Sequence, residues 1–385
     1  MLLLEIVEKR RVVIRDQSTR DVLRKGHFGE PKQGGTIELS PEEALYLMDV
    51  RDAECSEDGR KLHFNQVAER FGVKGKLMAR YFTYKDWRDR GLIAKYSGSA
   101  SGQGKAPSKR YPSSTLKLRN YSMQGIFFPA DLLTIVDDSE AGRAIYVDHW
   151  FGQYGTYKLS ERGVLNKLDA YEAIYLIDKG VLRVTDATRK EIFDTATRRR
   201  TDFPKLYSVY EDWRDKGYVV KTGFKFGTHF RIYFPGARPI KESGEEWIHS
   251  KHVIHVFPRD TKLLISEWAR AIRVAHSVRK TFILAIPGRS RAKKLSMDFV
   301  LYHRKAGNIE IPEQDSPRFG MLSLSEDEQI GGAELSAIIN DAKEQKLELI
   351  IAIADRETAV TYYKVSRIEL PRSEFEYYEI DWMQP

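Results

Sequence analysis

The chain has 385 residues, of which 42% are hydrophobic and 31% are charged, and this composition is typical of a globular protein rather than a disordered one. Its single cysteine excludes an internal disulfide framework and a cysteine-rich zinc site. No segment approaches 18 uncharged apolar residues, so we expect no membrane span and no signal peptide, and the cytoplasm is the simplest location. The net charge of +8 favours a polyanionic partner, although many basic proteins bind none.

The charge is divided unevenly along the chain. Residues 221–310 contain 18 Lys and Arg against 7 Asp and Glu, whereas residues 311–385 contain 7 against 16. A basic segment joined to an acidic one can bind RNA with the first and contact a basic surface with the second. Separately solvated faces remain the alternative for the acidic part.

Two sequence blocks occur twice. "EALYLMD" at Glu43–Asp49 returns as "EAIYLID" at Glu172–Asp178, and "YKDWRDRG" at Tyr84–Gly91 returns as "YEDWRDKG" at Tyr210–Gly217. The offsets are nearly equal, so the blocks are corresponding parts of a duplicated unit. Each copy is predicted to contain strands, then helices, then an aromatic-rich helix that ends at a glycine.

The region between the copies and one insertion differ from this repeat. Ser97–Ser114 is rich in Gly, Ser, Pro and Lys and indicates a linker. The second copy has extra residues before its "EAIYLID" helix, which bring Lys158, Arg162 and Lys167. A solvated loop is the simplest interpretation of this insertion, and contact with RNA is the alternative.

The second copy continues beyond the point where the first stops. We predict strands in "HFRIYFPG" and "KHVIHVF", a helix of about 18 residues starting near Thr261, and strands in "TFILAI" and "DFVLYH". A fainter echo of this helix and strand follows, "AELSAIINDAKEQKLELIIAI", and then the strand "VTYYKVSRIEL". The sequence therefore predicts an α+β chain of duplicated small units with mixed or antiparallel sheets. The expected parts are an N-terminal half-unit (1–96), a linker (97–120), the two domains of a complete unit (121–220 and 221–307) and a C-terminal half-unit (308–385).

Three histidines, His249, His252 and His255, lie close together in "WIHSKHVIHVF". The β-branched run before Pro258 favours a strand, on which His252 and His255 point to opposite faces. His249 and His255 would lie roughly 20 Å apart, and no HExxH, CxxC or aspartate cluster accompanies them. The pattern therefore disfavours a metal site and leaves His249, before the strand, as the best candidate of the three to lie free in solvent or in a site. Taken alone, a surface or capping histidine is the simpler interpretation of His249.

Three segments resemble the catalytic motifs of the archaeal tRNA splicing endonucleases, also called tRNA-intron lyases. They are "FRIY" (Phe230–Tyr233), "HSKHVIHV" (His249–Val256) and "RVAHSVRK" (Arg273–Lys280). The repeated helical blocks are similar to that family's N-terminal domain. The layout of half-unit, complete unit and half-unit resembles the fused three-unit class, whose homodimer imitates a four-unit assembly.

This resemblance implies cleavage of RNA without a metal ion or cofactor, which leaves a 2′,3′-cyclic phosphate and a 5′-hydroxyl. Tyr233 would be the general base, His249 the general acid and Lys280 the group that stabilises the extra negative charge. An imidazole, with an ordinary pKa near 6.5, and a lysine ammonium suit these roles. A tyrosine, with a pKa near 10, needs neighbouring cations to lower it, and Lys280, Arg231 and Lys251 are candidates. Alternatively, Tyr233 only orients the 2′-hydroxyl.

The resemblance also implies contacts with precursor tRNA folded into a bulge–helix–bulge. Family members hold a bulged base between two arginines, and Arg273 matches the first. The second is expected on the strand after the catalytic lysine, where Arg304 is our candidate. The loop "ADRETAV" resembles the acidic loop that inserts into a basic pocket of a partner unit, with Asp355 and Glu357 supplying the charge. The C-terminal half-unit carries Leu347 at the lysine position and is expected to be structural.

Two other functions compete with this one. A non-catalytic RNA-binding subunit of a tRNA-processing complex would keep the basic surface and the repeats but would need none of the three motif residues. A metal-dependent nuclease would require a carboxylate cluster, which the sequence does not suggest.

Overall fold

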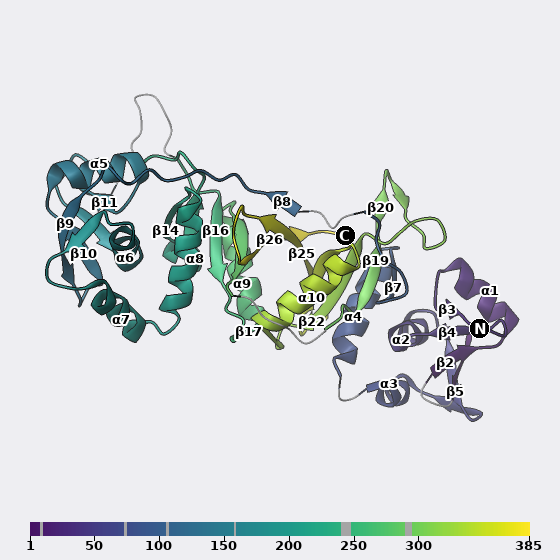
Figure 1. The fold of residues 1–385 in the computed structure, drawn as a ribbon. Coiled ribbons are helices and arrows are strands. Elements are labelled where there is room, and N and C mark those ends of the chain that lie inside the picture. Colours follow the sequence, from purple (N-terminus) through teal and green to yellow (C-terminus); the bar gives the residue numbers. More distant parts are fainter. Residues whose placement is uncertain (8–10, 73–74, 105–107, 158, 240–247, 289–294) are drawn as a thin grey trace.

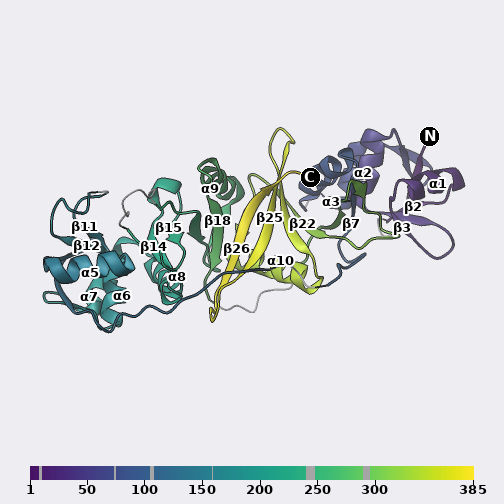
Figure 2. The same ribbon diagram turned by 90° about the horizontal axis from the view of Figure 1, so that it is seen from above.

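The computed structural model describes residues 1–7, 11–72, 75–104, 108–157, 159–239, 248–288 and 295–385. The molecule is elongated, with two small end domains on either side of a long central sheet (Figures 1 and 2). The N-terminus lies in one end domain and the C-terminus lies beside the central sheet (Figure 1). This architecture confirms the predicted α+β class. No helix in the described part of the chain has the length and apolar character needed to cross a bilayer.

The first end domain has the strand order β3-β4-β2-β1-β5-β6. Its elements are β1 (Leu3–Val7), β2 (Arg11–Ile14), α1 (Gln17–Lys25), β3 (Glu30–Pro31), β4 (Ile37–Leu39), α2 (Pro41–Val50), β5 (Glu54–Glu57), β6 (Arg60–Leu62), α3 (Phe64–Gly72) and α4 (Leu77–Asp89). Strand β1 pairs antiparallel with β2 and parallel with β5.

The second end domain has the strand order β11-β12-β10-β9-β13. Its elements are β9 (Met123–Phe128), β10 (Leu133–Val136), α5 (Ser139–His149), β11 (Gln153–Tyr154), β12 (Asn166–Asp169), α6 (Ala170–Asp178), β13 (Leu182–Val184), α7 (Arg189–Arg199) and α8 (Phe203–Asp215). Strand β9 pairs antiparallel with β10 and parallel with β13, as β1 does with β2 and β5. The two end domains therefore share the duplicated topology that the repeated blocks predict.

Helices α2 and α6, which carry the first repeated block, begin in the same way. The side chain of Ser40 accepts a hydrogen bond from the backbone of Glu43, whose carboxylate accepts one from the backbone of Ser40. Asp169 and Glu172 form the same reciprocal pair at the start of α6. This capping box satisfies N–H groups that the first helical turn leaves without partners, and it fixes where each helix starts.

The central sheet has the order β14-β15-β16-β18-β26-β25-β24-β22-β19-β7. Its strands and the elements around them are β7 (Ile93–Tyr96), β8 (Ser108–Arg110), β14 (Val219–Thr222), η1 (Phe224–Phe226), β15 (Phe230–Tyr233), β16 (His252–Val256), β17 (Lys262–Leu264), α9 (Ile265–Ser277), β18 (Thr281–Ile286), β19 (Phe299–Tyr302), β20 (Arg304–Lys305), β21 (Asn308–Ile309), β22 (Phe319–Ser325), β23 (Gln329–Gly331), α10 (Gly332–Glu344), β24 (Glu348–Ala354), β25 (Val360–Glu369) and β26 (Glu376–Met383). Helix α9 begins later than we expected from Thr261, because Lys262–Leu264 pairs with β23.

The central sheet consists of two similar halves. The first half contains β14, β15, β16, β18 and β26, and the second half contains β7, β19, β22, β24 and β25. Val365 of β25 lies opposite Ile380 of β26 where the halves meet. Ile380 in turn lies opposite Phe282 of β18, and Val365 lies opposite Leu349 of β24. An approximate two-fold axis between β25 and β26 therefore relates the halves.

The halves do not follow the order of the chain. Strand β7 comes directly after the first end domain but pairs with β19, more than 200 positions later. The last strand, β26, returns to pair with β18. We expected Phe299–Tyr302 in the catalytic domain, but this strand belongs to the second half. The reason is that both edges of β18 are already paired, with β16 and with β26. Part of the predicted linker is ordered as well, because β8 pairs with β25.

The second repeated block attaches each end domain to one half. On α8, the carboxylate of Asp212 accepts a hydrogen bond of 2.6 Å from Tyr377 of β26, and Trp213 packs on the same tyrosine. On α4, Asp86 accepts a hydrogen bond of 2.6 Å from Tyr362 of β25. The first end domain therefore belongs with the second half of the sheet, and the second end domain with the first half.

Candidate active site

The three predicted catalytic residues lie at neighbouring strand ends in the first half. Tyr233 is the last residue of β15, His249 lies a few residues before β16, and Lys280 directly precedes β18. Strand β15 is antiparallel to β16, and β16 is parallel to β18. The carboxyl end of β15 is therefore beside the amino ends of the other two strands, so the sheet register brings these positions together.

Ser250 connects two of the predicted residues. The Lys280 ammonium donates hydrogen bonds to the backbone carbonyl of Ser250 and, over 3.1 Å, to its Oγ. The same serine forms a side-chain hydrogen bond with Tyr233. Ser250 is 5% exposed, whereas the preceding residue, His249, is exposed. Ser250 is not one of the predicted catalytic residues, although it lies within the motif "HSKHVIHV".

The position of Lys280 is set by the end of α9. Arg279 has a φ of 54°, in the left-handed region. The backbone N–H of Lys280 donates to the carbonyl of Ala275 over 2.9 Å. This pattern ends the helix and turns the chain directly into β18, so the lysine side chain starts from a fixed point.

Burial has the largest effect on the pKa values of both Lys280 and Tyr233. Burial lowers the pKa of Lys280, and the nearby Arg231 guanidinium lowers it further. Burial also raises the pKa of Tyr233, which is 6% exposed, while Arg231 and the hydrogen bond with Ser250 oppose this rise. We expected neighbouring cations to bring the tyrosine pKa down. Arg231 acts in that direction, but the cost of burying a phenolate outweighs it.

Trp150 of the second end domain contacts Tyr233. The two ring centroids are 4.6 Å apart, and Trp150 adopts a left-handed conformation, with φ of 52°, at the end of α5. Trp150 lies outside the three catalytic motifs. The two copies do contain a signal, because "WFG" at 150–152 corresponds to "HFG" at 27–29, so the repeat differs at this position.

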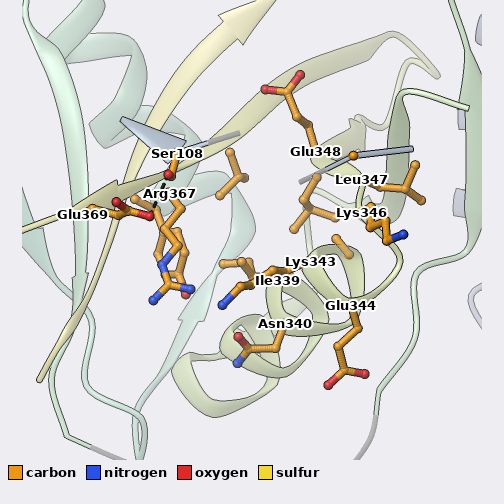
Figure 3. Close-up of a pocket in the computed structure, with 15 residues that line it drawn as sticks. Ser108, Ile339, Asn340, Lys343, Glu344, Lys346, Leu347, Glu348, Arg367 and Glu369 are labelled. Atoms are coloured by element: carbon orange, nitrogen blue, oxygen red, sulfur yellow. Dashed lines mark hydrogen bonds between the residues drawn. The ribbon is translucent and has the colours of Figure 1, made fainter. Parts of the chain in front are cut away.

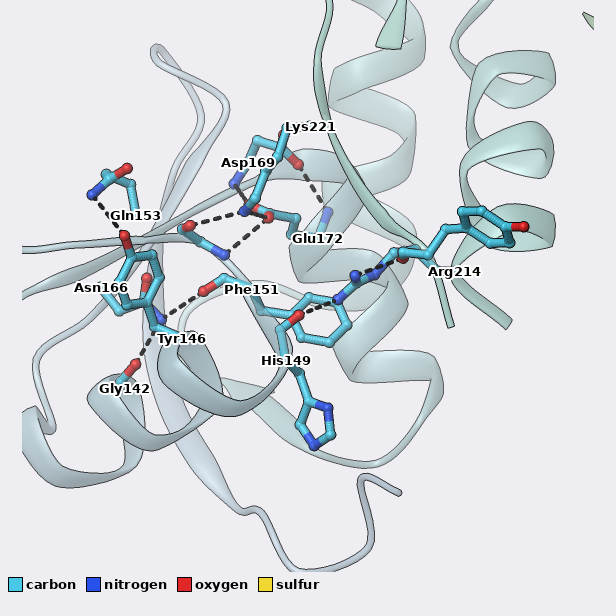
Figure 4. Close-up of polar contacts among 12 residues, drawn as sticks. Gly142, Tyr146, His149, Phe151, Gln153, Asn166, Asp169, Glu172, Arg214 and Lys221 are labelled. Carbon is cyan, nitrogen blue, oxygen red and sulfur yellow. Dashed lines mark hydrogen bonds and ion pairs between the residues drawn. The ribbon is translucent and has the colours of Figure 1, made fainter. Parts of the chain in front are cut away.

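A buried polar network fixes the segment that carries Trp150 (Figure 4). The Glu172 carboxylate accepts a hydrogen bond of 2.9 Å from the backbone of Gly152 and forms an ion pair with Lys221. The Lys221 ammonium also donates to the carbonyl of Gly152 over 2.8 Å. Arg214 donates to the carbonyl of His149 over 3.0 Å. Because Lys221 lies on β14, these contacts hold the end domain against the strands of the candidate site.

The predicted RNA-contacting cations differ in their surroundings. Arg273 on α9 and Arg162 in the insertion are exposed. Lys167 is half-buried, and its ammonium donates to the carbonyl of Gly155, so this lysine helps to close the insertion. Lys158 lies outside the described residues. Arg273 and Arg162 are therefore accessible from solvent, whereas Lys167 is partly withdrawn.

Arg304 does not lie where we expected the second base-holding arginine. The strand after Lys280 is β18, in the first half, whereas Arg304 lies on β20, which follows β19 of the second half. Its guanidinium donates to the carbonyl of Arg90, at the end of α4, over 2.9 Å. The assignment rested on sequence order, and the chain crosses to the other half before it reaches Arg304.

Asp355 and Glu357 lie in the exposed turn between β24 and β25. One oxygen of Asp355 accepts hydrogen bonds of 2.9 Å from the backbone of Glu357 and of Ala359. This contact shapes the turn and leaves the Glu357 side chain exposed, so the loop presents its acidic groups to the surroundings.

The histidine run forms a strand, as predicted. His252 and His255 lie on β16, and the pKa of His255 is lowered to about 4 by burial. The His255 ring packs against that of His229 at 4.6 Å. In the part of the chain that the structure describes, no three His, Cys, Asp or Glu side chains are grouped in a way that could hold a metal ion.

A cavity of about 700 Å³ lies in the second half, where α10 meets β24 and β25 (Figure 3). Arg367, Lys343 and Leu347 contribute to its lining, and Ser108 donates a hydrogen bond of 2.8 Å to Glu369 at one side. No histidine is among its lining residues. The cavity therefore has no counterpart of His249 in its lining.

Comparisons with known proteins agree with the motifs. The family model described as "tRNA intron endonuclease, catalytic C-terminal domain" matches residues 203–296, and that described as "tRNA intron endonuclease, N-terminal domain" matches residues 5–68. A tRNA-splicing endonuclease of Methanosarcina mazei is 30% identical over 338 residues, covering 72% of this chain and 92% of the relative. That of Methanosarcina acetivorans is 29% identical over 342 residues, covering 73% and 94%. That of Pyrobaculum arsenaticum is 33% identical over 165 residues, covering 40% and 86%.

Proposed function

Because this chain belongs to the tRNA-splicing endonuclease family, we propose that it cleaves precursor tRNA at exon–intron borders folded into a bulge–helix–bulge. The reaction uses no metal ion and leaves a 2′,3′-cyclic phosphate and a 5′-hydroxyl. The observation that supports this most directly is the convergence of Tyr233 and Lys280 on Ser250, beside the exposed His249.

In this mechanism the RNA supplies its own nucleophile. The 2′-hydroxyl oxygen attacks the adjacent phosphorus and gives up its proton to solvent water, while the bond from phosphorus to the 5′ oxygen breaks and His249 donates a proton to that oxygen. Lys280 lies where negative charge grows on the phosphorane oxygens, and its two hydrogen bonds to Ser250 hold it ready before the substrate binds. The third ammonium hydrogen is left for the phosphate.

Tyr233 is best suited to orient the 2′-hydroxyl. Burial raises its pKa above the ordinary value near 10, so very little phenolate exists near neutrality. A neutral phenol with its ring packed on Trp150 still holds a hydroxyl in a fixed direction. Of the two roles that the sequence left open, this geometry favours positioning over proton abstraction.

We further propose that the chain works as a homodimer in the cytoplasm. Both intron borders must be cut, and two copies of the first half would provide two sites at a fixed separation. Asp355 and Glu357 would insert their charge into a basic surface of the other copy. Arg273, with Arg162, Lys158 and Lys167 in the insertion, would contact the RNA.

The test is incubation of the purified protein with an intron-bearing tRNA in excess EDTA, followed by analysis of the product ends. Cleavage to a cyclic phosphate is expected for the natural protein, and cleavage by His249→Ala should be at least about a hundredfold slower. Binding without any cleavage would instead identify a non-catalytic RNA-binding subunit. Cleavage that EDTA abolishes would identify a metal-dependent nuclease.

A further inference from the structure

Phe224 is unusually exposed. Its side chain is 87% exposed, the highest value among the large hydrophobic side chains that the structure describes. It lies on η1, in the connection between β14 and β15. Aromatic side chains usually bury most of their surface, so full exposure of this ring beside a candidate active site requires an explanation.

The turn that carries Phe224 is well fixed. The backbone of Phe226 donates to the carbonyl of Gly223 over 2.8 Å, and that of Gly227 donates to the carbonyl of Phe224 over 3.2 Å. Gly227 has a φ of 64°, which closes the turn at little steric cost. Gly223 lies so close to Thr228 that a side chain at this position would meet its backbone. The ring of Phe224 is therefore presented from a defined backbone.

The two residues that follow Phe224, Lys225 and Phe226, each contact a side chain from another part of the chain. The Lys280 ammonium lies 4.6 Å from the ring centre of Phe226, and the Lys225 ammonium lies 5.3 Å from the ring centre of Tyr157 in the insertion. Phe224 is two residues from Phe226, which places their Cα atoms within about 7 Å. One or two nucleotides span such a distance, so the exposed ring lies within reach of RNA bound at Lys280.

The second half of the sheet has no equivalent turn. Strands β7 and β19 occupy the places of β14 and β15, but Tyr96 ends the first of them and Phe299 begins the second, and no short turn joins them. Within the described residues, a short turn that joins these two strands and exposes an aromatic ring is thus found only in the half that carries Lys280 and His249.

We propose that Phe224 is a stacking platform for an unpaired nucleobase next to the cleaved bond, an inference that rests on the proposed RNA cleavage. Unstacked bases in RNA bulges bind to aromatic faces, and such stacking tolerates any base because each has a π-face. Lys225 follows Phe224 in the turn, and Arg231 lies close enough to affect both Lys280 and Tyr233, so these cations would hold the phosphate backbone beside the ring. The platform thus contributes to binding and to the position of the cut.

The experiment compares Phe224→Leu, which keeps an apolar side chain, with Phe224→Trp, which keeps the aromatic face. Substrates are a bulge–helix–bulge RNA and copies with an abasic residue at each bulge position in turn. Phe224→Leu should raise KM about tenfold, equivalent to about 1.4 kcal/mol, with kcat changed much less. Phe224→Trp should remain close to the natural protein. At the bulge position whose base stacks on Phe224, the abasic RNA should give Phe224→Leu and the natural protein the same KM.

The matched control is Tyr96→Leu, which removes an aromatic side chain, 56% exposed, from the second half and should leave KM unchanged. An unchanged KM for Phe224→Leu would overturn the platform, as would a difference that persists with every abasic RNA. Loss of the dimer in Phe224→Leu, measured by light scattering, would also overturn it and assign the ring to a protein interface. If the natural protein does not cleave at all, the proposed function itself fails, a result separate from these.

Discussion

In the first half of the central sheet, three adjacent strand ends carry a tyrosine, a serine and a lysine, whereas the same ends in the second half carry a tyrosine, a proline and a leucine. Strand register gives the correspondence, since Tyr233 lies opposite Val219 and Tyr302 lies opposite Ile93. The corresponding pairs are Tyr233 and Tyr302, His249 and Ser316, Ser250 and Pro317, and Lys280 and Leu347. At the end of the first helix of each end domain, Trp150 corresponds to His27.

The features that both halves share belong to the common fold, and the features that differ are candidates for a role in the reaction. The tyrosine is present in both halves, so a tyrosine at this strand end does not by itself mark an active site. Arg279 and Lys346 both adopt left-handed conformations where the helix ends, so the turn before the lysine position belongs to the framework. Leu347 is buried, and the second half gains packing where the first has a charge. The first half is distinguished by the histidine, the serine and the lysine, and the end domain attached to it is distinguished by the tryptophan.

The largest effect on kcat is expected when His249 is replaced by serine, the residue found at the corresponding position 316 of the second half. His249→Ser removes the proposed general acid, and we expect kcat to fall by about 10²–10⁴-fold. The rate is measured with intron-bearing tRNA under single-turnover conditions. Ser316→Ala, in the second half, is the control and should cleave normally. Normal cleavage by His249→Ser would contradict the assignment.

The second largest effect on kcat is expected at Lys280. Lys280→Leu removes the charge near the phosphorane, and kcat should fall by about 10²–10³-fold. Because burial and Arg231 lower the pKa of Lys280, its charge is lost at a lower pH than that of an ordinary lysine. The rate should therefore decline on the alkaline side below about pH 10.5. In Lys280→Arg this decline should move to higher pH, and an unmoved decline would assign it to another group.

Tyr233→Phe tests the tyrosine that both halves share. Removal of one hydroxyl that positions the nucleophile should lower kcat about tenfold. Because its pKa is raised, the Tyr233 phenol stays neutral between pH 6 and 8. If Tyr233 only positions the nucleophile, the slope of log kcat against pH over this range should be the same in the variant and in the natural protein. A slope that disappears with the hydroxyl would instead identify a general base. Tyr302→Phe should have no effect on cleavage.

Trp150→His introduces the residue that the first end domain has at this place. Loss of the ring contact with Tyr233 should lower kcat about fivefold, since such pairs contribute about 0.5–1.5 kcal/mol. KM should change little, which distinguishes this effect from a loss of RNA binding. His27→Ala is the control. Equal changes in both variants would show that the contact only stabilises the end domains.

The smallest effect concerns stability. Asp169 caps α6, whereas Ser40 caps α2, and burial raises the pKa of Asp169 from 3.8 to about 7. Between these values the folded protein binds more protons than the unfolded chain, so the free energy of unfolding should fall as pH rises from about 4 to about 7. Asp169→Ser should keep the cap and flatten this dependence. The melting temperatures of both proteins are measured across this pH range. If the two proteins show the same dependence on pH, the contribution of Asp169 is refuted.

Much of the candidate site could be predicted from the sequence because its parts lie in short motifs. The positions of His249 and Lys280 next to predicted strands follow from local patterns and the family resemblance. Ser250 and Trp150 could not be selected in this way, since their contacts join β16 to β18 and the end domain to β15. The placement expected for Arg304 was wrong for the same reason, because neighbouring positions in the chain lie in different halves of the sheet.

The sequence by itself determined the duplication, the α+β class and the motif residues, because periodicity, caps and repeated blocks are local properties of the chain. Only the tertiary structure decided that β26 completes the first half and that β7 joins the second. Strand pairing depends on which edges are free and which faces need burial, and these conditions arise only after distant segments meet. The raised pKa of Tyr233 has the same origin, since burial is a property of the assembled fold.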